Sequence, residues 1–308
     1  MPARLPAVHR GPLDGHTADE VRALAAEATA ADGVAPLSEG PLLALGTGTA
    51  TVHLLTRDVD GALGGYAQLD LGAPDVGSAE LVVAPPLRRA GMGRRLLEAL
   101  RQVAATSPDA DPPRSLVVWA HGDLPAARAL ATAAGMDVVR ELWQMTVDLD
   151  EHPVDPDPTL PHGVTVTAFR RGADEERWRR VNARAFAHHP EQGRITREDL
   201  EARMSEPWFD PEGFLLAERD GVLLGSVWTK VHPAQDDREP VGEIYVVGVD
   251  PDAQGLGLGG ALTRLGLAHL AARGLRRVML YTDADNTVAV RTYTRAGFER
   301  TGVDVQFG

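Results

Sequence analysis

The sequence contains no cysteine, few aromatic residues and a single lysine. The lack of cysteine excludes a disulfide scaffold, a metal site with thiolate ligands and a cysteine nucleophile. No apolar run approaches the roughly 18 residues of a membrane span, and the N-terminus lacks the apolar stretch of a signal peptide, so we expect a cytoplasmic protein. Lys230 is the one lysine among 31 basic residues, an exception to a strong preference for arginine.

The chain has 308 residues and a formal net charge of −13 at pH 7, and neither half is basic. A nucleic-acid-binding module or a protein that rests on anionic lipid presents a basic face, so both classes are excluded. A single domain usually holds roughly 100–200 residues, which predicts two domains here. The proline-rich, acidic segment 148–161 predicts a linker between a domain at 1–150 and a domain at 151–308.

The two halves repeat one order of elements. A hairpin signal around Asp60-Gly61 recurs around Asp220-Gly221, 160 residues further along. In each half a strand that ends in proline, a glycine-rich turn and a helix follow, with an offset of 166 between Pro85 and Pro251. Each half therefore predicts two helices, three strands and then helix, strand, helix and strand. The expected fold is α/β, with a mixed, mostly antiparallel sheet flanked by helices in each half.

Two helix starts carry capping signals. Thr17-Ala18-Asp19-Glu20 has the form of a capping box, with Thr17 as the N-cap of the first helix. In the second half, Thr196–Asp199 opens another helix.

The glycine-rich turns share the pattern Q/R-x-x-G-x-G, at Arg88–Gly93 and at Gln254–Gly259. Strand, glycine turn and helix together present free backbone N–H groups, which favours a phosphate site. Gly255, Gly257 and Gly260 also satisfy the dinucleotide fingerprint G-x-G-x-x-G. A hairpin precedes that turn and the first copy does not fit the fingerprint, so a dinucleotide-binding fold is the weaker interpretation.

The shared pattern resembles motif A of the GCN5-related N-acetyltransferases (GNAT), whose loop wraps the pyrophosphate of acetyl-CoA. Asn286, Ala289, Tyr293 and Gly297-Phe298 resemble motif B of that family in order and spacing. The resemblance covers both halves and implies two tandem GNAT domains, with acetyl-CoA as co-substrate and no metal. The family commonly carries basic residues inside the loop, whereas the second copy has Gly255-Leu256. We expect pyrophosphate binding there to rest on backbone donors and the helix dipole.

The residues that the resemblance assigns to acetyl-CoA lie in both halves. In the first half they are Leu81, Val82, Val83, Arg89, Ala90, Gly91, Met92, Gly93 and Arg94. In the second half they are Val247, Gly248, Val249, Gln254, Gly255, Leu256, Gly257, Leu258, Gly259, Gly260, Asn286, Thr287, Val288, Ala289, Val290 and Arg291.

Acetyl transfer to an amine needs a base for the amine and an acid for the leaving thiolate. We expect Glu243 as the base and Tyr293 as the acid. Aligning the halves puts Gly77 opposite Glu243 and Ala131 opposite Tyr293, so the first half is expected to bind acetyl-CoA without transferring it. The alternatives are a solvated strand-end carboxylate for Glu243 and a core tyrosine for Tyr293.

Further stretches along nearly the whole chain, such as Trp119–Gly122 and Trp228–Pro233, resemble an actinobacterial branch of the tandem acetyltransferases. That resemblance implies a small-molecule acceptor, the cysteinyl amine of Cys-GlcN-Ins, and a monomer that acts without nucleic acid or membrane. The implied acceptor-binding residues are Glu39, Glu191, Lys230, Glu243 and Tyr281.

Other interpretations of the same sequence stay open. Lys230 could be an exposed strand-end residue. His188-His189 invites a metal site, but no spaced partner follows and turn histidines are expected instead. The rival functions are an acetyltransferase for another amine, such as an aminoglycoside or a protein N-terminus, and a non-catalytic acyl-CoA sensor.

Overall fold

The computed structural model describes residues 5–48, 51–106, 113–187, 189, 192–234 and 239–308. The chain divides into two compact units: unit 1 is Met1–Glu141 with Val303–Gly308, and unit 2 is Leu142–Gly302. This division differs from the expected boundary at residue 150 because two strands, β6 (Val138–Asp148) and β12 (Glu299–Phe307), each begin in one unit and end in the other. Of the expected linker, Leu149 and Val154 pack against the core of unit 2.

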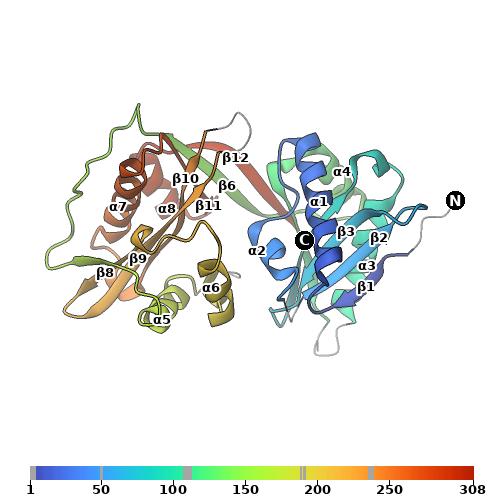
Figure 1. The fold of residues 1–308 in the computed structure, drawn as a ribbon, viewed down its shortest axis with the longest axis horizontal. Coiled ribbons are helices and arrows are strands. Elements are labelled where there is room, and N and C mark those ends of the chain that lie inside the picture. Colours follow the sequence, from blue (N-terminus) through green and yellow to red (C-terminus); the bar gives the residue numbers. More distant parts are fainter. Residues whose placement is uncertain (1–4, 49–50, 107–112, 188, 190–191, 235–238) are drawn as a thin grey trace. The chain divides into compact units, whose positions relative to one another are not determined.

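The elements follow the predicted repeat (Figure 1). Unit 1 contains β1 (Ala7–Arg10), α1 (Gly15–Asp32), α2 (Glu39–Ala44), β2 (Thr51–Arg57), β3 (Leu63–Asp70), β4 (Val76–Val83), α3 (Met92–Ala105), β5 (Ser115–Ala120), α4 (Pro125–Ala133) and the start of β6. Unit 2 contains β7 (Thr165–Ala168), α5 (Glu175–Ala185), α6 (Arg197–Met204), β8 (Phe214–Arg219), β9 (Val222–His232), β10 (Val241–Val249), α7 (Leu258–Ala272), β11 (Arg277–Asp283) and α8 (Thr287–Arg295). The sequence missed β1 and β7, which at four residues each are too short to show an alternating pattern.

Each sheet is antiparallel except at one strand pair. In unit 1 the strand order is β1-β2-β3-β4-β5-β12, and β4 runs parallel to β5. In unit 2 the order is β6-β11-β10-β9-β8-β7, and β10 runs parallel to β11. A helix connects each parallel pair, α3 in unit 1 and α7 in unit 2, because parallel neighbours need a crossover. The expected mixed, mostly antiparallel sheets are confirmed.

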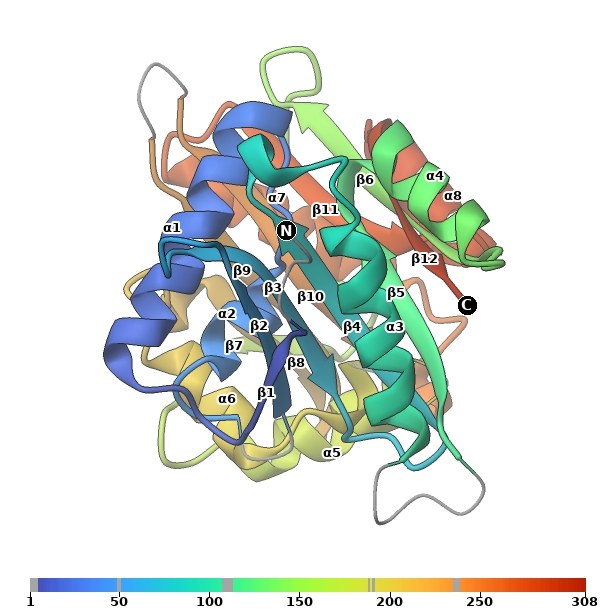
Figure 2. The ribbon, with the colours of Figure 1, turned by 90° about the vertical axis from the view of Figure 1, so that its right-hand side faces the viewer.

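Alternation along the strands sends apolar side chains to both faces of each sheet. In unit 1, Leu54 and Leu69 pack with α3 and α4 on one face, while Tyr66 and Val82 pack with α1 on the other. Figure 2 shows α3 running along β4 and β5. In unit 2, one face carries α7 and α8, and the other carries α5 and α6 with an aromatic cluster around Trp228. Both units are three-layer α/β folds, as the repeat predicts.

The start of α1 differs from the expectation. Its N-cap is Asp14, not Thr17: the Asp14 carboxylate accepts from the Thr17 backbone N–H at 3.0 Å and from its hydroxyl at 2.8 Å. Asp is as good an N-cap as Thr, and here it lets the helix begin one turn earlier. The capping box at Thr196 and Asp199 is confirmed. Among the described residues, no helix has the length and apolar character of a membrane span.

Candidate active site

The parallel strands of unit 2 part in the middle of the sheet. Pairing between β10 and β11 covers Gly242–Ile244, although β10 continues to Val249. A register shift between Ile244 and Val246 marks a β-bulge against β9, and bulges bend the strand that carries them. The backbone groups of Val247–Val249 that face β11 lie beyond the paired stretch, so they are available to a ligand.

A glycine turn follows directly and leads into α7. Gly255 and Gly257 have φ values of 81° and 76°, in the left-handed region that glycine adopts without steric cost. Gly257 is the N-cap of the 15-residue helix α7, whose first N–H groups have no partner within the helix. The turn is therefore an anion cradle built from backbone donors.

Unit 1 forms the same turn with different side chains. Arg89 and Gly91 occupy the two left-handed positions, with φ values of 65° and 79°. Arg88 does not face a ligand, because its guanidinium forms two hydrogen bonds to Asp32, at 2.7 and 2.8 Å. Arg94, expected to contact acetyl-CoA, donates to Glu98 at 2.8 Å.

Three residues of the expected acetyl-CoA contacts belong to the hydrophobic cores. Met92 and Leu258, the first residues of α3 and α7, are 6% and 1% exposed, and Val82 of β4 is 3% exposed. Only their backbone groups can face a ligand. Asn286 caps α8, since its side-chain oxygen accepts from the Ala289 N–H at 3.1 Å.

Glu243 is buried at the point where the strands part. It is 6% exposed, and its Oε2 lies 2.7 Å from Nε2 of His232 on β9. The side chain of His232 is 40% exposed and so connects the buried carboxylate to solvent. A solvated strand-end carboxylate does not describe Glu243. The arrangement holds one carboxylate in a fixed position beside a group that can exchange protons with water.

Lys230 lies directly opposite Glu243 in the β9–β10 register. It is 9% exposed, which excludes the exposed strand-end interpretation. Its Nζ stands 4.5 Å from the ring centre of Trp208 and 5.3 Å from that of Tyr245. Cation–π attraction to the two rings offsets part of the cost of burying the ammonium group. Sequence reasoning gave neither Trp208 nor Tyr245 a role.

Tyr293 lies on α8 against the core of unit 2. Its ring meets that of Phe298 edge-on, with the centres 6.0 Å apart. Burial raises the pKa of Tyr293 to about 12. The phenol is therefore protonated at neutral pH and able to donate a proton, whether or not a substrate is bound.

The corresponding positions of unit 1 lack these groups. Gly77 is a buried glycine of β4, Ala131 is 4% exposed on α4, and Leu124 occupies the N-cap of α4 without a side-chain hydrogen bond. The predicted alignment of Ala131 with Tyr293 and of Leu124 with Asn286 agrees with their places on the last helix of each unit.

A different polar cluster occupies unit 1 where β4 and β5 part, beyond Ala79. Glu80 accepts from the Ser38 backbone N–H at 2.7 Å and from its hydroxyl at 2.6 Å, and lies 3.3 Å from Nε2 of His121. The other ring nitrogen of His121 is 3.0 Å from Asp304. Burial alone would lower the pKa of His121, but the two carboxylates raise it to about 10. Sequence reasoning missed this cluster because its members are far apart in the chain.

The remaining expected acceptor residues lie on different elements. Glu39 begins α2 in unit 1, and Tyr281 lies on β11 in unit 2 with 42% of its surface exposed. Glu191 lies outside the described residues. His189, as expected for a turn histidine, accepts a hydrogen bond from the Gln192 N–H at 3.0 Å. Within the described part of the chain, no group of three His, Asp or Glu side chains is arranged to hold a metal ion.

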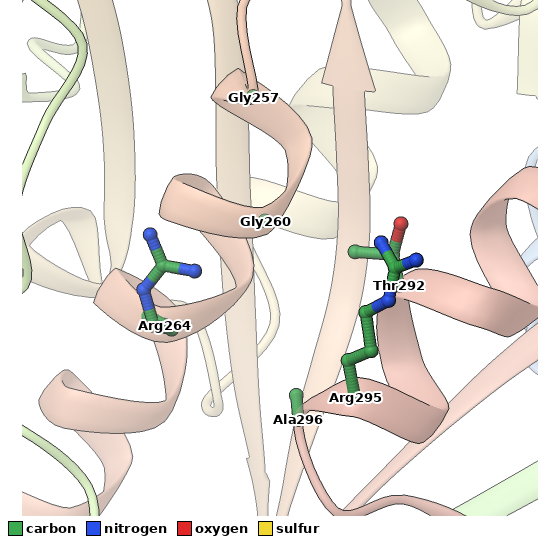
Figure 3. A pocket seen from close by; sticks show the side chains of 6 residues that line it. All are labelled: Gly257, Gly260, Arg264, Thr292, Arg295 and Ala296. Atoms are coloured by element: carbon green, nitrogen blue, oxygen red, sulfur yellow. The ribbon is translucent and has the colours of Figure 1, made fainter.

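A cavity of about 300 Å³ opens beside the glycine turn of unit 2. Figure 3 shows its lining residues on the side of α7: Gly257, the N-cap, with Gly260 and Arg264 of the helix. The residues that line it from α8 and its end are Thr292, Arg295 and Ala296.

The sequence profile described as "Acetyltransferase (GNAT) family" matches residues 178–298. The match places the glycine turn, Glu243 and Tyr293 of unit 2 inside a GNAT acetyltransferase domain. GNAT enzymes take the acetyl group from acetyl-CoA, and the glycine turn and the parted strands of unit 2 both lie within the matched residues.

Full-length relatives narrow the class. The chain is 62% identical to the mycothiol acetyltransferase of Cellulomonas flavigena, over 97% of this chain and 87% of that protein. It is 55% identical to the mycothiol acetyltransferase of Sanguibacter keddieii, over 97% of this chain and 95% of that protein. The chain therefore belongs to the mycothiol acetyltransferases of the GNAT family and is an acetyl-CoA-dependent N-acetyltransferase.

Solved structures share the tandem fold. A GCN5-related N-acetyltransferase from Sphaerobacter thermophilus superposes with a TM-score of 0.70 at 26% identity, over 98% of this chain and 94% of that one. A tandem GNAT protein from the clavulanic acid biosynthesis pathway has the same TM-score, 0.70, at 21% identity and covers 98% of both chains. The expected fold of two tandem GNAT domains is confirmed.

Proposed function

We propose that this protein acetylates the cysteinyl amine of Cys-GlcN-Ins, giving mycothiol and CoA, as a monomer in the cytoplasm. The names of its full-length relatives support the reaction. The structural observation that carries the proposal is the buried Glu243, flanked by Lys230 and His232 where β10 and β11 part. A carboxylate next to a lysine suits an acceptor that has both a cationic amine and many hydroxyls.

Glu243 acts as the general base. An α-amine has a pKa of about 8, so only about a tenth of it is neutral at pH 7. Glu243 takes the proton, either directly or through a water molecule, and the neutral nitrogen attacks the thioester carbonyl. The hydrogen bond to His232 fixes the orientation of the carboxylate and gives the proton a route to solvent.

The attack creates an oxyanion and then a thiolate. Backbone N–H groups of the unpaired stretch Val247–Val249 stabilise the oxyanion as the C–N bond forms. When the tetrahedral intermediate collapses, the C–S bond breaks and Tyr293 gives its proton to the CoA sulfur. The nitrogen gives up its second proton to solvent as the amide forms, and the phenolate of Tyr293 takes a proton back from solvent. An exposed thiol has a pKa of about 8.5, and an apolar environment raises that pKa, which favours protonation of the leaving sulfur over release of a free thiolate.

Lys230 donates hydrogen bonds to hydroxyls of the sugar or the inositol. The two aromatic rings beside it restrict the ammonium group and so direct its remaining donors. Tyr281 is exposed enough to meet the acceptor. Glu39 and Glu191 stay predicted acceptor ligands.

Unit 1 binds acetyl-CoA without transferring its acetyl group. It has the backbone cradle but neither of the two catalytic side chains of unit 2. Gly93 tests this division of labour, because a Cβ there would stand 3.3 Å from Leu130. We expect Gly93→Trp to remove one acetyl-CoA site in a calorimetric titration and to leave kcat unchanged. Loss of all turnover in a folded variant would contradict it.

The decisive experiment is direct. Purified protein is incubated with acetyl-CoA and Cys-GlcN-Ins, an aminoglycoside or a peptide N-terminus, and mass spectrometry identifies the acetylated product. We expect acetylation of Cys-GlcN-Ins and a much lower rate with the other amines. Faster acetylation of another amine would replace the proposed acceptor, and CoA release from none of them would favour an acyl-CoA sensor.

A further inference from the structure

The cavity between α7 and α8 has an unusual charge. Arg264 and Arg295 are the only charged residues among the described residues that line it. Neither forms a hydrogen bond or an ion pair with any other described residue. Two guanidinium groups without a carboxylate give the cavity a positive potential, and planar guanidinium groups bind phosphate oxygens well.

Gly260 determines where Arg264 lies. A Cβ at position 260 would stand 3.4 Å from Nη1 of Arg264 and 3.9 Å from Cγ2 of Thr292. The guanidinium group of Arg264 thus turns back over Gly260, one helical turn toward the start of α7, as helical side chains do. This places its charge next to the glycine turn, whose backbone donors form the anion cradle (Figure 3).

The positions of unit 1 that correspond to the two arginines carry different side chains. With the offset of 166 residues, Arg94 stands in place of Gly260 and Glu98 in place of Arg264. These two side chains form an ion pair with each other at 2.8 Å. Ala133 takes the place of Arg295 at the offset of 162. Because α3 and α7 both form, the fold does not require the unpaired arginines of unit 2.

We propose that Arg264 and Arg295 bind the phosphate group on the ribose of acetyl-CoA, its 3′-phosphate. The proposal rests on acetyl-CoA binding in unit 2 and deepens it. Acetyl-CoA carries a pyrophosphate and one phosphomonoester, and the phosphomonoester bears a charge of about −1.5 to −2 at pH 7. The glycine turn provides backbone donors for the pyrophosphate. The cationic cavity beside it is matched to the remaining group, the phosphomonoester.

The test pairs a change in the protein with a change in the ligand. Calorimetric titration of the full chain compares acetyl-CoA with 3′-dephospho-acetyl-CoA, for the wild type and for the double variant Arg264→Gln/Arg295→Gln. We expect the wild type to bind the dephospho ligand about 10- to 100-fold more weakly in unit 2, the range for hydrogen bonds to a charged group. In the double variant this ratio should fall toward one, because only the affinity for acetyl-CoA decreases. The double variant changes only unit 2, so ligand binding by unit 1 contributes equally to the titrations of both proteins.

Arg277→Gln is the matched control, since it removes the same charge from an exposed residue at the start of β11. It should keep the wild-type ratio. If the double variant also keeps that ratio, or weakens both ligands equally, the two arginines do not bind the 3′-phosphate. The titration needs no acceptor, so its result can be interpreted even if Cys-GlcN-Ins is not the substrate.

Discussion

The two glycine turns have the same backbone but carry different charged side chains on the helices around them. Arg89 and Gly255 both adopt the left-handed conformation, as do Gly91 and Gly257. Around the turn of unit 1, arginines bind neighbouring carboxylates, as Arg88 binds Asp32. Around the turn of unit 2, the arginines stand on α7 and α8 and face a cavity. The backbone cradle is a property of the fold, whereas its charge is free to differ between copies.

A second difference lies where the parallel strands part. In unit 2 this place holds Glu243, which connects through His232 to solvent. In unit 1 it holds Glu80, whose oxygens are engaged by Ser38 and His121. A carboxylate is a poor base when both of its oxygens accept hydrogen bonds and an imidazolium lies beside it. The comparison supports the proposal that Glu243 is the base of unit 2, because Glu80 of unit 1 is held in a structural network instead.

The largest expected effect is on turnover. We expect Glu243→Gln to lower kcat by about 100-fold or more, the usual contribution of a general base. The rate of product formation is measured by mass spectrometry at saturating acetyl-CoA. Glu80→Gln is the matched change in unit 1 and should leave kcat of the folded protein unaltered. If Glu243→Gln retains more than a third of the activity, the two carboxylates do not differ in the way proposed.

Next comes the stability of unit 1. His121 has a pKa of about 10 in the folded protein and about 6.5 when unfolded, so its stabilising effect is complete below pH 6.5 and is lost as the pH rises through 10. We expect Asp304→Asn to lower the free energy of unfolding by about 3 kcal/mol at pH 7, since it breaks a buried ion pair. Hydrogen exchange of amides in β5 measures this loss. Asp137→Asn, an exposed change in the same unit, should have little effect, and equal effects would rule out the ion pair as the cause.

Removal of the Tyr293 hydroxyl tests whether Tyr293 is the general acid. We expect Tyr293→Phe to lower kcat by about 10- to 100-fold, with little change in the Kd of acetyl-CoA. Because the pKa of Tyr293 is about 12, its ionisation should not appear in the pH–rate profile below pH 10. Tyr66→Phe makes the same change in unit 1 and should lower stability only, through its lost hydrogen bond to Gln68. A kcat unchanged by Tyr293→Phe, with the chemical step limiting, would remove the acid role.

The smallest expected effect concerns the turns themselves. Arg89 is a non-glycine residue in the left-handed region, which costs about 1 kcal/mol. Arg89→Gly should therefore raise the free energy of unfolding by about 0.5–1 kcal/mol, and Gly255→Arg should lower it by about 1 kcal/mol. Thermal unfolding of both variants tests the pair. If Arg89→Gly lowers the free energy of unfolding, or Gly255→Arg raises it, the two turns do not share one backbone geometry.

The sequence predicted most of the fold because its signals are local. The hairpins around Asp60-Gly61 and Asp220-Gly221, the prolines before the turns and the glycine patterns all appear where the repeat places them. The short strands β1 and β7 escaped detection, and Asp14 replaced Thr17 as N-cap because several residues near a helix start can serve. The boundary between the units could not be predicted, since β6 and β12 cross it and their partners lie far along the chain.

For the candidate active site, local sequence patterns predicted which residues take part but not which residues they contact. The repeat and its motifs determined that Glu243 and Tyr293 belong to unit 2 alone, and they singled out Lys230. Only the tertiary structure decided that Lys230 is buried against two aromatic rings, that His232 contacts Glu243 and that Arg264 faces an open cavity. The physical reason is that charge and hydrogen-bond pairing depend on distances across strands and between helices. Composition and spacing along one chain do not fix those distances.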